Sequence, residues 1–555
     1  MKAVLRVLPL LAIIALLGVA VLPAAGQDMM SESAPDCDYG GSLKSVEAVD
    51  AMTVKFTLCV PDPALPAKVA FSAMAIHSAD QLQAAADAAA ASADPAAYVA
   101  DDLLNNPIGT GPYKLDHWDR GNELVLTKND SYWGTAAIEP TVIIKQNAEA
   151  SARLVELQAG TADGIALVAP GDFPVIEGDA NLKLFPIPPS NVFYLGINNT
   201  MAPFDNIKVR QAIAHAIDKQ RIVDNFYPAG STVATQFMPP SIFGYTPDSK
   251  SNNFDLDLAK QLMADSGVTL PIETTLSYRN VVRGYLPQPP IVAADLQAQL
   301  KEIGINVTLN EVESGEFIAG ATAGKYPLHM LGWGADYPDA TNFLDYHFNN
   351  PNLKQFGAQD PKLTALLTKA AQLASPEERL PIYKEANDEI ADFVPMEPIA
   401  NGGSGDAYLA KIKNAYVSGF SATQFALLED PDDDNIVYIG AGEPISLYCN
   451  DESDGETFRV CEQINQSLLG YESSGGNVVA ALATEWSANA DLTEWTFKLR
   501  EGVKFSDGSD FDANDVAASY IAMWDAASPL HVGNTRQFSY WGAFFGSFLN
   551  APPAS

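Results

Sequence analysis

LATEWSANADLTEWTFKLREGVKFSDGSDFDANDV, residues 482–516, combines the signals of a strand, a tight turn and a helix start in one stretch. Apolar and polar residues alternate across 495–500, which is the two-residue period of a half-buried strand. The Asp-Gly pair at 507–508 predicts a tight turn, and Asp512 or Asn514 can cap the helix that follows. The stretch therefore predicts a strand, a turn and a helix in direct succession.

The same stretch resembles a signature of solute-binding protein family 5, the dipeptide- and oligopeptide-binding receptors of ABC importers. In that family the pattern reads roughly LA-x-x-W, a turn, YTF-x-LR-x-GVKF-x-DG and AxDV. The family carries the signature near the start of the mature chain, whereas here it lies near the end of the sequence. The residues that match are Leu482, Ala483, Trp486, Thr496, Phe497, Leu499, Arg500, Gly502, Val503, Lys504, Phe505, Asp507, Gly508, Ala513, Asp515 and Val516.

Other segments resemble the family in a shifted order. SVEAVDAMTVKFTL (45–58), NPIGTGPY (106–113) and PFDNIKVRQAIAHAID (203–218) resemble parts that the family carries after its signature. From Ile436 onward the sequence resembles the family's mature N-terminus. The resemblance thus covers almost all of residues 37–550 as a circular permutation, and no block occurs twice.

This resemblance implies an α/β, two-lobe, periplasmic-binding-protein-like fold of type II, cluster C, with an extra subdomain and a circularly permuted chain order. The acidic, proline-interrupted stretch EDPDDDN would link the two permuted parts. The expected divisions are 1–26 signal peptide, 27–200 first lobe and extra subdomain, 201–400 second α/β lobe, 401–428 return to the first lobe, 429–435 linker, and 436–555 the remainder of the first lobe and extra subdomain.

The residues of the second lobe also predict a wound sheet by themselves. Ile272–Ser277 has a strand pattern, Ile291–Ile303 keeps helical spacing up to Gly304, and residues 305–309 alternate as the next strand. A strand, a helix and a strand at this spacing form a βαβ unit. Ligands bind at the carboxyl ends of the strands in such a sheet.

Composition describes a globular protein with room for more than one lobe, at 555 residues with 47% hydrophobic and 18% charged residues. Asp and Glu number 69 against 33 Lys and Arg, which gives a formal net charge of −36 at pH 7. This charge argues against a nucleic acid as partner, because both would be negative. It attracts cations mildly, but we interpret it first as a solubility or salt adaptation.

The first residues have the pattern of an export signal. Lys2 and Arg6 precede an apolar run at 7–22, and the small residues at 23–26 form a cleavage pattern. We therefore expect an extracytoplasmic protein, in the periplasm or at the cell exterior. An apolar run of this length can also remain as an uncleaved membrane anchor.

The four cysteines of an exported chain predict disulfides, with three possible connectivities. We favour the two local pairs, Cys37 with Cys59 and Cys449 with Cys461. No CxxC or Cys/His cluster has the spacing of a zinc site.

Asp336 is the first candidate for a ligand contact. It follows the strand pattern at 327–333 by three residues, so its carboxylate would face the crevice between the lobes. GWGADYPDATNFL resembles the family motif W-x-x-D, whose aspartate pairs with the α-ammonium group of a peptide. Trp333 would then be an adjacent pocket wall, and Tyr337 a further candidate. In the competing interpretation Asp336 and Asp339 only shape a turn around the proline between them.

Glu443, Pro444 and Ile445 form the second candidate surface. The family's equivalent turn offers backbone groups to an extended peptide, although an ordinary turn is the alternative. Glu443 could also face a ligand cation. Arg279 and Arg283, just past a predicted strand, are possible partners for a ligand carboxylate.

The resemblance implies a receptor that is not an enzyme. Two lobes would close on a peptide, or on another small solute with a cationic head, by hinges near 198–202 and near Ile399. The closed form would dock, as a monomer, on an ABC permease in the membrane, with no cofactor and no metal. The alternatives are a same-fold binder of a nickel chelate or oligosaccharide, and an exported hydrolase, for which no HExxH spacing or GxSxG elbow is present.

Overall fold

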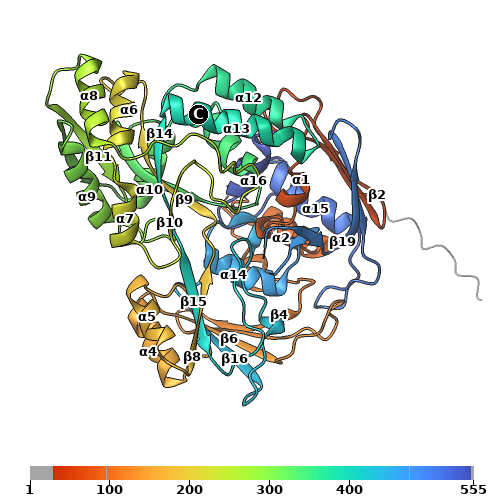
Figure 1. Cartoon of the computed structure of the whole chain (residues 1–555). Coiled ribbons are helices and arrows are strands. Elements are labelled where there is room, and N and C mark those ends of the chain that lie inside the picture. The colour runs from red at the N-terminus through yellow and green to blue at the C-terminus, as the bar shows by residue number, and fades with distance from the viewer. Residues whose placement is uncertain (1–28, 96, 474, 552–555) are drawn as a thin grey trace, which may run out of the picture.

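The computed structural model describes residues 29–95, 97–473 and 475–551, which form two lobes joined by two strand crossings (Figure 1). The signal peptide expected at 1–26 lies outside these residues. Across the described ranges no helix combines the length and hydropathy that crossing a membrane requires.

The stretch 482–516 folds beside strands from the start of the described chain. Its strand pattern becomes β20 (Glu494–Leu499), and its helix α15 (Ala513–Trp524) is capped by Asp512 in a capping box. β20 pairs antiparallel with β3 (Thr53–Leu58). The five-stranded sheet has the order β1 (Ser31–Ser33), β2 (Leu43–Asp50), β3, β20 and β19 (Ala483–Ala488).

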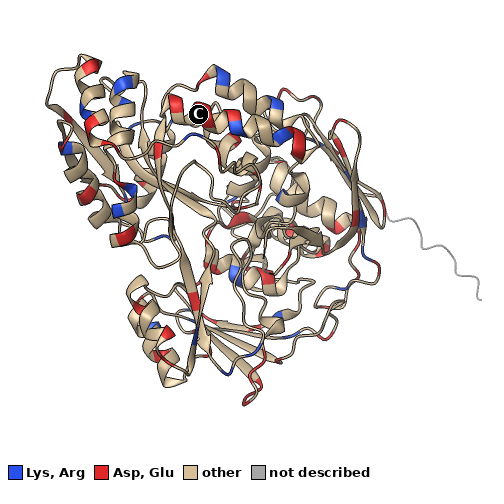
Figure 2. Cartoon of the chain, viewed as in Figure 1, with Lys and Arg blue, Asp and Glu red and all other residues tan. Residues whose placement is uncertain are grey.

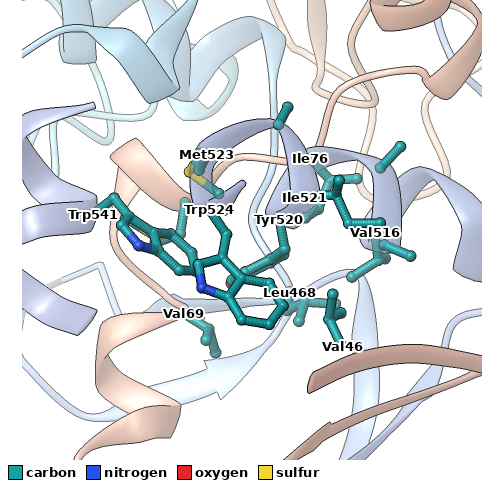
Figure 3. Close-up of a cluster of buried hydrophobic side chains, with 14 of the residues drawn as sticks. Val46, Val69, Ile76, Leu468, Val516, Tyr520, Ile521, Met523, Trp524 and Trp541 are labelled. Atoms are coloured by element: carbon teal, nitrogen blue, oxygen red, sulfur yellow. The ribbon is translucent and has the colours of Figure 1, made fainter. Parts of the chain in front are cut away.

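Helix α15 lies at the centre of the largest apolar core and is buried along its whole length. A helix that is apolar on all sides needs neighbours all round. It packs on β2 and α2 (Ala79–Ala91), and Trp524 stacks on Trp541 of α16 (Ser539–Phe545) with ring centroids 6.4 Å apart (Figure 3). The shorter elements of this lobe are α1 (Leu65–Lys68), α3 (Asp101–Asn105), β17 (Leu469–Tyr471) and β18 (Val478–Ala480).

A seven-stranded sheet completes the first lobe. Helix α14 (Gly455–Ile464) covers one face, and α4 (Ala150–Ala159) and α5 (Phe173–Glu177) cover the other. The strand order is β4 (Tyr113–Asp119), β5 (Glu123–Lys128), β6 (Thr141–Gln146), β16 (Asn435–Gly440), β7 (Gly164–Ile165), β15 (Ser404–Leu409) and β8 (Leu182–Ile187). The central strand β16 thus comes from the later part of the chain.

The second lobe is built on a six-stranded sheet. The expected βαβ unit is present, since β11 and β12 are parallel and α9 (Pro289–Lys301) connects them. The strand order is β10 (Thr232–Val233), β14 (Met396–Asn401), β9 (Asn191–Ile197), β13 (Leu328–Gly334), β11 (Ile272–Tyr278) and β12 (Ile305–Glu311).

Side chains of β9 alternate between two buried faces of this sheet. Phe193 and Leu195 belong to the core under α6–α9, whereas Val192 and Tyr194 belong to the core under α12 and α13. The helices are α6 (Ile207–Ala216), α7 (Lys219–Phe226), α8 (Leu256–Ser266), α10 (Ser314–Thr322), α11 (Tyr346–Phe348), α12 (Pro361–Ala371) and α13 (Pro376–Phe393), with a π-turn at Thr341–Asp345.

The two lobes are joined where β8 continues into β9 and where β14 continues into β15. Asn191 links these crossings, since its Nδ2 donates to the carbonyl oxygen of Gly402 at 2.7 Å and its Oδ1 accepts from Gly402 N at 2.9 Å. A Cβ at Gly402 would lie 2.0 Å from the carbonyl oxygen of Gly284. The chain passes between the lobes before β9, whereas the hinge expected at 198–202 would lie beyond the far end of that strand, within the second lobe. The expected position of the first hinge is therefore corrected to the crossing before β9.

Segments distant in sequence meet along one seam of the first lobe. Gly41 and Gly546 form an antiparallel bridge, and Ser42 N donates to the carbonyl oxygen of Phe545 at 2.7 Å. The sulfur atoms of Cys37 and Cys59 are 2.07 Å apart, and those of Cys449 and Cys461 are 2.14 Å apart, which is bonding distance for both local pairs.

Charged residues of both signs are distributed over the outer helices of the two lobes (Figure 2). Partly exposed pairs such as Lys384–Asp388, 2.9 Å apart on α13, are typical of a solvated helix surface. This distribution agrees with the interpretation of the net charge as a solubility feature.

Candidate functional site

A cavity of about 630 Å³, here called the interlobe cavity, lies where the two lobes face each other. The second lobe contributes Trp333 and Asp336 from the end of β13 and the residues just after it. The first lobe contributes Phe71, Phe458 and Tyr540 from the opposite side. The carboxyl end of a sheet strand thus opens into the crevice, as expected for a wound sheet.

Asp336 is held in place by a side chain of the π-turn that follows it. Asn342 donates from Nδ2 to Asp336 Oδ2 at 2.8 Å, and Asp336 N donates to Asn342 Oδ1 at 3.0 Å. The residue is only 9% exposed, and this burial raises the pKa of its carboxyl to about 7. The result is a positioned acid that ionises near neutral pH.

Two tyrosines of the first lobe reach Asp336 across the crevice. Tyr540 and Asp336 both line the interlobe cavity, and the Tyr540 hydroxyl lowers the pKa of the acid, opposing the larger effect of burial. The Tyr471 hydroxyl lies 3.4 Å from the Asp336 carbonyl oxygen and donates to Ala67 O at 2.7 Å. The acid is therefore a contact point between the lobes.

Asp339 has the turn-forming role that was the alternative for both acids. Its Oδ1 accepts from Thr341 N at 3.0 Å, and its two oxygens accept from the Arg379 guanidinium at 2.7 and 2.8 Å. Arg379 belongs to α13, so this buried ion pair attaches the turn to that helix. Asp336 makes no such pair and borders the cavity instead.

Trp333 and Tyr337 lie on different sides of this segment. The Trp333 ring stacks on Tyr346 at 4.5 Å between centroids and lines the interlobe cavity. Tyr337 lines a separate cavity of about 830 Å³, where its ring lies against Phe544 and under the Lys68 ammonium. The structure therefore brings Trp333, but not Tyr337, together with Asp336.

Arginines line the interlobe cavity from the loop after β11. Arg279 donates to Ser314 Oγ and to Tyr285 Oη, each at 3.0 Å, so its guanidinium is held by neighbours. Arg283 lines the cavity and donates to the carbonyl oxygen of Val282 at 3.0 Å. The cavity thus has an acid from one loop and two bases from another.

Glu443, Pro444 and Ile445 do not border the interlobe cavity. Glu443 Oε1 instead accepts from Trp118 Nε1 at 3.0 Å and from Gly121 N at 2.8 Å, in the β4–β5 hairpin. Backbone from the first lobe reaches the cavity about ten residues later, at Ser453 and Gly455, just before and at the start of α14. Sequence reasoning missed this loop because neither residue type marks a binding site.

Two buried histidines near the site stay neutral. Burial lowers the pKa of His329 to about 4 and that of His347 to about 3. The Nδ1 atom of His347 lies 2.8 Å from the carbonyl oxygen of Phe343, a backbone contact that is typical of a buried structural histidine. The described part of the chain contains no group of three or more His, Cys, Asp or Glu arranged to hold a metal ion.

Comparison with known proteins gives one family. Residues 23–355 and 477–539 match the model of the bacterial extracellular solute-binding proteins, family 5. Among curated relatives, heme-binding protein A of Haemophilus influenzae is 29% identical over 69% of this chain and 69% of its own length. Di/tripeptide-binding protein 3 of Pseudomonas aeruginosa is 29% identical over 70% of this chain and 72% of its own length.

A solved structure gives the same result in three dimensions. The periplasmic binding protein DppA from Helicobacter pylori, in complex with the peptide STSA, superposes with a TM-score of 0.59 at 26% identity. The match covers 70% of this chain and 74% of that one.

Proposed function

Because the chain belongs to the bacterial extracellular solute-binding proteins of family 5, we propose that it captures peptides outside the cytoplasm for delivery to an ABC permease. Members of this family are binding proteins, and the proposed activity makes and breaks no covalent bond. The observation that carries the proposal is the buried carboxyl of Asp336 in a cavity bordered by both lobes. The di/tripeptide-binding relative and the peptide complex support a peptide as the ligand.

The chemistry of Asp336 suits the α-ammonium group of a peptide. A buried carboxylate holds a compact cation through a charge-assisted hydrogen bond. Asn342 already occupies Oδ2, and the ammonium would replace the hydroxyl of Tyr540 or join it. A bound cation would also return the carboxyl to its charged form, because an opposite charge lowers the pKa that burial has raised.

The backbone of β13 offers an edge for an extended ligand. β13 pairs with β11 only at Leu328 and His329, whereas its pairing with β9 continues to Gly334. Gly332 and Gly334 border the interlobe cavity on this stretch. Strand addition at such an edge gives affinity without selecting particular side chains.

Arg279 and Arg283 provide a place for the opposite end of a short peptide. Guanidinium groups bind carboxylates with matched, often bidentate geometry. A peptide with its ammonium at Asp336 and its carboxylate at this loop would have both charges paired inside the cavity. This arrangement favours short peptides whose two ends are free.

Delivery follows from closure about the two crossings at residues 188–190 and 402–403. In the proposed cycle the monomer closes on the peptide, and the closed form docks on the permease. Export by the N-terminal segment, with cleavage or retention as an anchor, belongs to the same proposal.

We also propose that the chain is a circular permutant of its family. The bridge between Gly41 and Gly546 supports this, because it joins the two segments that the family order would make continuous. The parallel pairing of β16 with β6 and β7 supports it as well, since β16 follows the acidic linker at the expected family start.

A heme or another non-peptide solute is the second candidate ligand, and the heme-binding relative favours it. Addition of hemin to the purified protein separates the two candidates. A saturable shift of the heme absorption band with no binding of dipeptides supports the second candidate.

The decisive experiment is calorimetric titration of Asp336→Ala with a di- or tripeptide series. We expect binding to weaken by about 2 to 5 kcal/mol, as for removal of one partner of a desolvated charge pair. Asp257→Ala, at an exposed acid of α8, is the matched control. The same peptide with an acetylated N-terminus should bind wild type weakly and lose little further in Asp336→Ala.

Equal affinity of wild type and Asp336→Ala would remove Asp336 from the site. Cleavage of the peptide during incubation would favour a hydrolase over a receptor.

A further inference from the structure

A separate cavity of about 460 Å³, here called the first-lobe cavity, lies inside the first lobe between α14 and the β17–β18 hairpin. Among the described residues that line it, Glu462 of α14 is the one acid, and no lysine, arginine or histidine is present. An acid without a basic neighbour on its cavity wall is a place where a cation from outside would be stabilised.

The Glu462 carboxyl is fixed at the cavity wall by two donors. The Ser72 hydroxyl donates to Oε1, and Ala422 N donates to Oε2 at 2.8 Å. Burial raises the pKa of Glu462 to about 7, because these two bonds and the more distant Arg459 only partly offset desolvation. The group is thus positioned but not neutralised by a partner.

Aromatic rings form much of the remaining wall. Trp133 and Tyr416 line the cavity, and each hydrogen-bonds another lining residue: Trp133 Nε1 donates to Gln466 at 2.6 Å, and Tyr416 Oη accepts from Gln424 N at 2.9 Å. A cation inside the cavity would therefore meet aromatic surface, which attracts cations. Trp133 already accepts one cation in this way, since the Arg500 guanidinium lies 4.0 Å from its ring centroid.

We propose that the first-lobe cavity is a side-chain subsite that takes a lysine or arginine of the bound peptide, with Glu462 as its ion-pair partner. Carboxylate and aromatic rings together are the groups that recognise ammonium and guanidinium ions. The proposal rests on the proposed peptide-binding function and adds the class of peptide, a basic one.

The two cavities are neighbours on one helix. Phe458 borders the interlobe cavity and Glu462, one turn later on α14, borders the first-lobe cavity. Residues four apart on a helix lie side by side. Tyr471 lines the first-lobe cavity while its hydroxyl lies 3.4 Å from the carbonyl oxygen of Asp336. Burial and the charges of both Asp336 and Glu462 raise the pKa of the Tyr471 hydroxyl, so the two acids lie near this one side chain. In the proposal, a long side chain of a peptide held at Asp336 passes Tyr471 to reach Glu462.

The test is a titration of wild type and Glu462→Gln with matched tripeptides. The set contains trialanine and, at each position in turn, lysine, norleucine or Nε-acetyl-lysine. For one position of lysine, wild type should bind the lysine peptide at least about tenfold more tightly than its norleucine and acetyl-lysine counterparts. Glu462→Gln should lose this preference and keep its affinity for trialanine. Glu485→Gln, at an exposed acid of β19, should behave as wild type.

Each outcome has one meaning. If wild type binds no peptide of the set, the proposed function fails. If wild type binds peptides but prefers lysine at no position, the subsite is wrong while the receptor stands. If the preference persists in Glu462→Gln, another group recognises the charge and the proposal is overturned. Because the charge is also removed on the ligand, wild type alone can refute the subsite even if the variant folds poorly.

Discussion

The two lobes differ in how the chain supplies their sheets. All six strands of the second-lobe sheet come from residues 191–401, whereas both large sheets of the first lobe combine strands from before and after this segment. The seams include β3 with β20, β6 with β16, and β7 with β15. Contacts between distant residues close long loops, which carries an entropic cost and slows folding. We therefore expect the second lobe to fold independently and the first lobe only with both of its segments present.

Phe497→Ala should give the largest effect on this difference. Phe497 is fully buried in β20 and lies edge-on to Phe56 of β3, 5.6 Å between ring centroids, so its removal opens the seam itself. We expect the unfolding free energy of the first lobe to fall by about 3–5 kcal/mol. Differential scanning calorimetry should show one of two transitions shifted to lower temperature, since two lobes need not unfold as one.

Leu296→Ala is the matched change in the second lobe, where Leu296 of α9 is equally buried. It should shift the other transition, by about 2–5 kcal/mol. A single transition that both variants shift equally would contradict independent lobes.

Mild reduction of the Cys37–Cys59 disulfide alone, whose Cys37 is exposed, should give a smaller effect of the same kind. This bond lies in the first lobe and closes a loop with a sequence separation of 22. Chain entropy gives about 3 kcal/mol for such a bond. A thiol reductant should lower the first-lobe transition and leave the second unchanged, and thermal scans with and without reductant test this. Equal shifts of both transitions would contradict the assignment.

A pH-dependent effect is expected from Asp336, at the boundary of the two lobes. Its folded pKa of about 7 lies above the ordinary value of 3.8, so the folded protein binds a proton where the unfolded chain does not. Its stabilisation is therefore complete below pH 3.8 and is lost as the pH rises through about 7. Asp336→Asn should remove this dependence, measured as the difference in melting temperature from wild type between pH 4.5 and 7.5.

Asp345, Glu462 and Asp515 also have pKa values raised to about 7 by burial, but they are common to both proteins and cancel in the difference. A difference that stays constant over this range would show that Asp336 is ionised throughout.

Local patterns predicted the elements well because their causes are local. The strand and capped helix of 482–516 and the βαβ unit of the second lobe are present within one to three residues of the expected bounds. Alternation and capping depend on neighbours in the sequence, so they can be read there.

The candidate site depended on distant residues, and there sequence reasoning was incomplete. Asp336 and Asp339 look alike in the sequence, and their roles separate only because Arg379 on α13 engages Asp339. The loop at Ser453 borders the cavity through its place in the fold, and its residues that line the cavity carry no charge that the sequence would reveal. Glu443 was predicted as a site residue because it is charged, but it does not border the cavity. The first hinge was predicted at the wrong end of β9. For the second crossing the sequence does carry a signal, the Gly402-Gly403 pair.

The close approach of Gly402 to Gly284 has a consequence for how the length of a bound ligand affects the opening of the lobes. The loop that carries Arg279 and Arg283 continues into Gly284, which lies directly against the crossing between β14 and β15, so we expect the loop to move with this crossing when the lobes open. A peptide long enough to bind this loop would thereby slow the reopening of the two lobes. A shorter one, held only at Asp336, would leave the crossing free, and we infer that such ligands dissociate sooner.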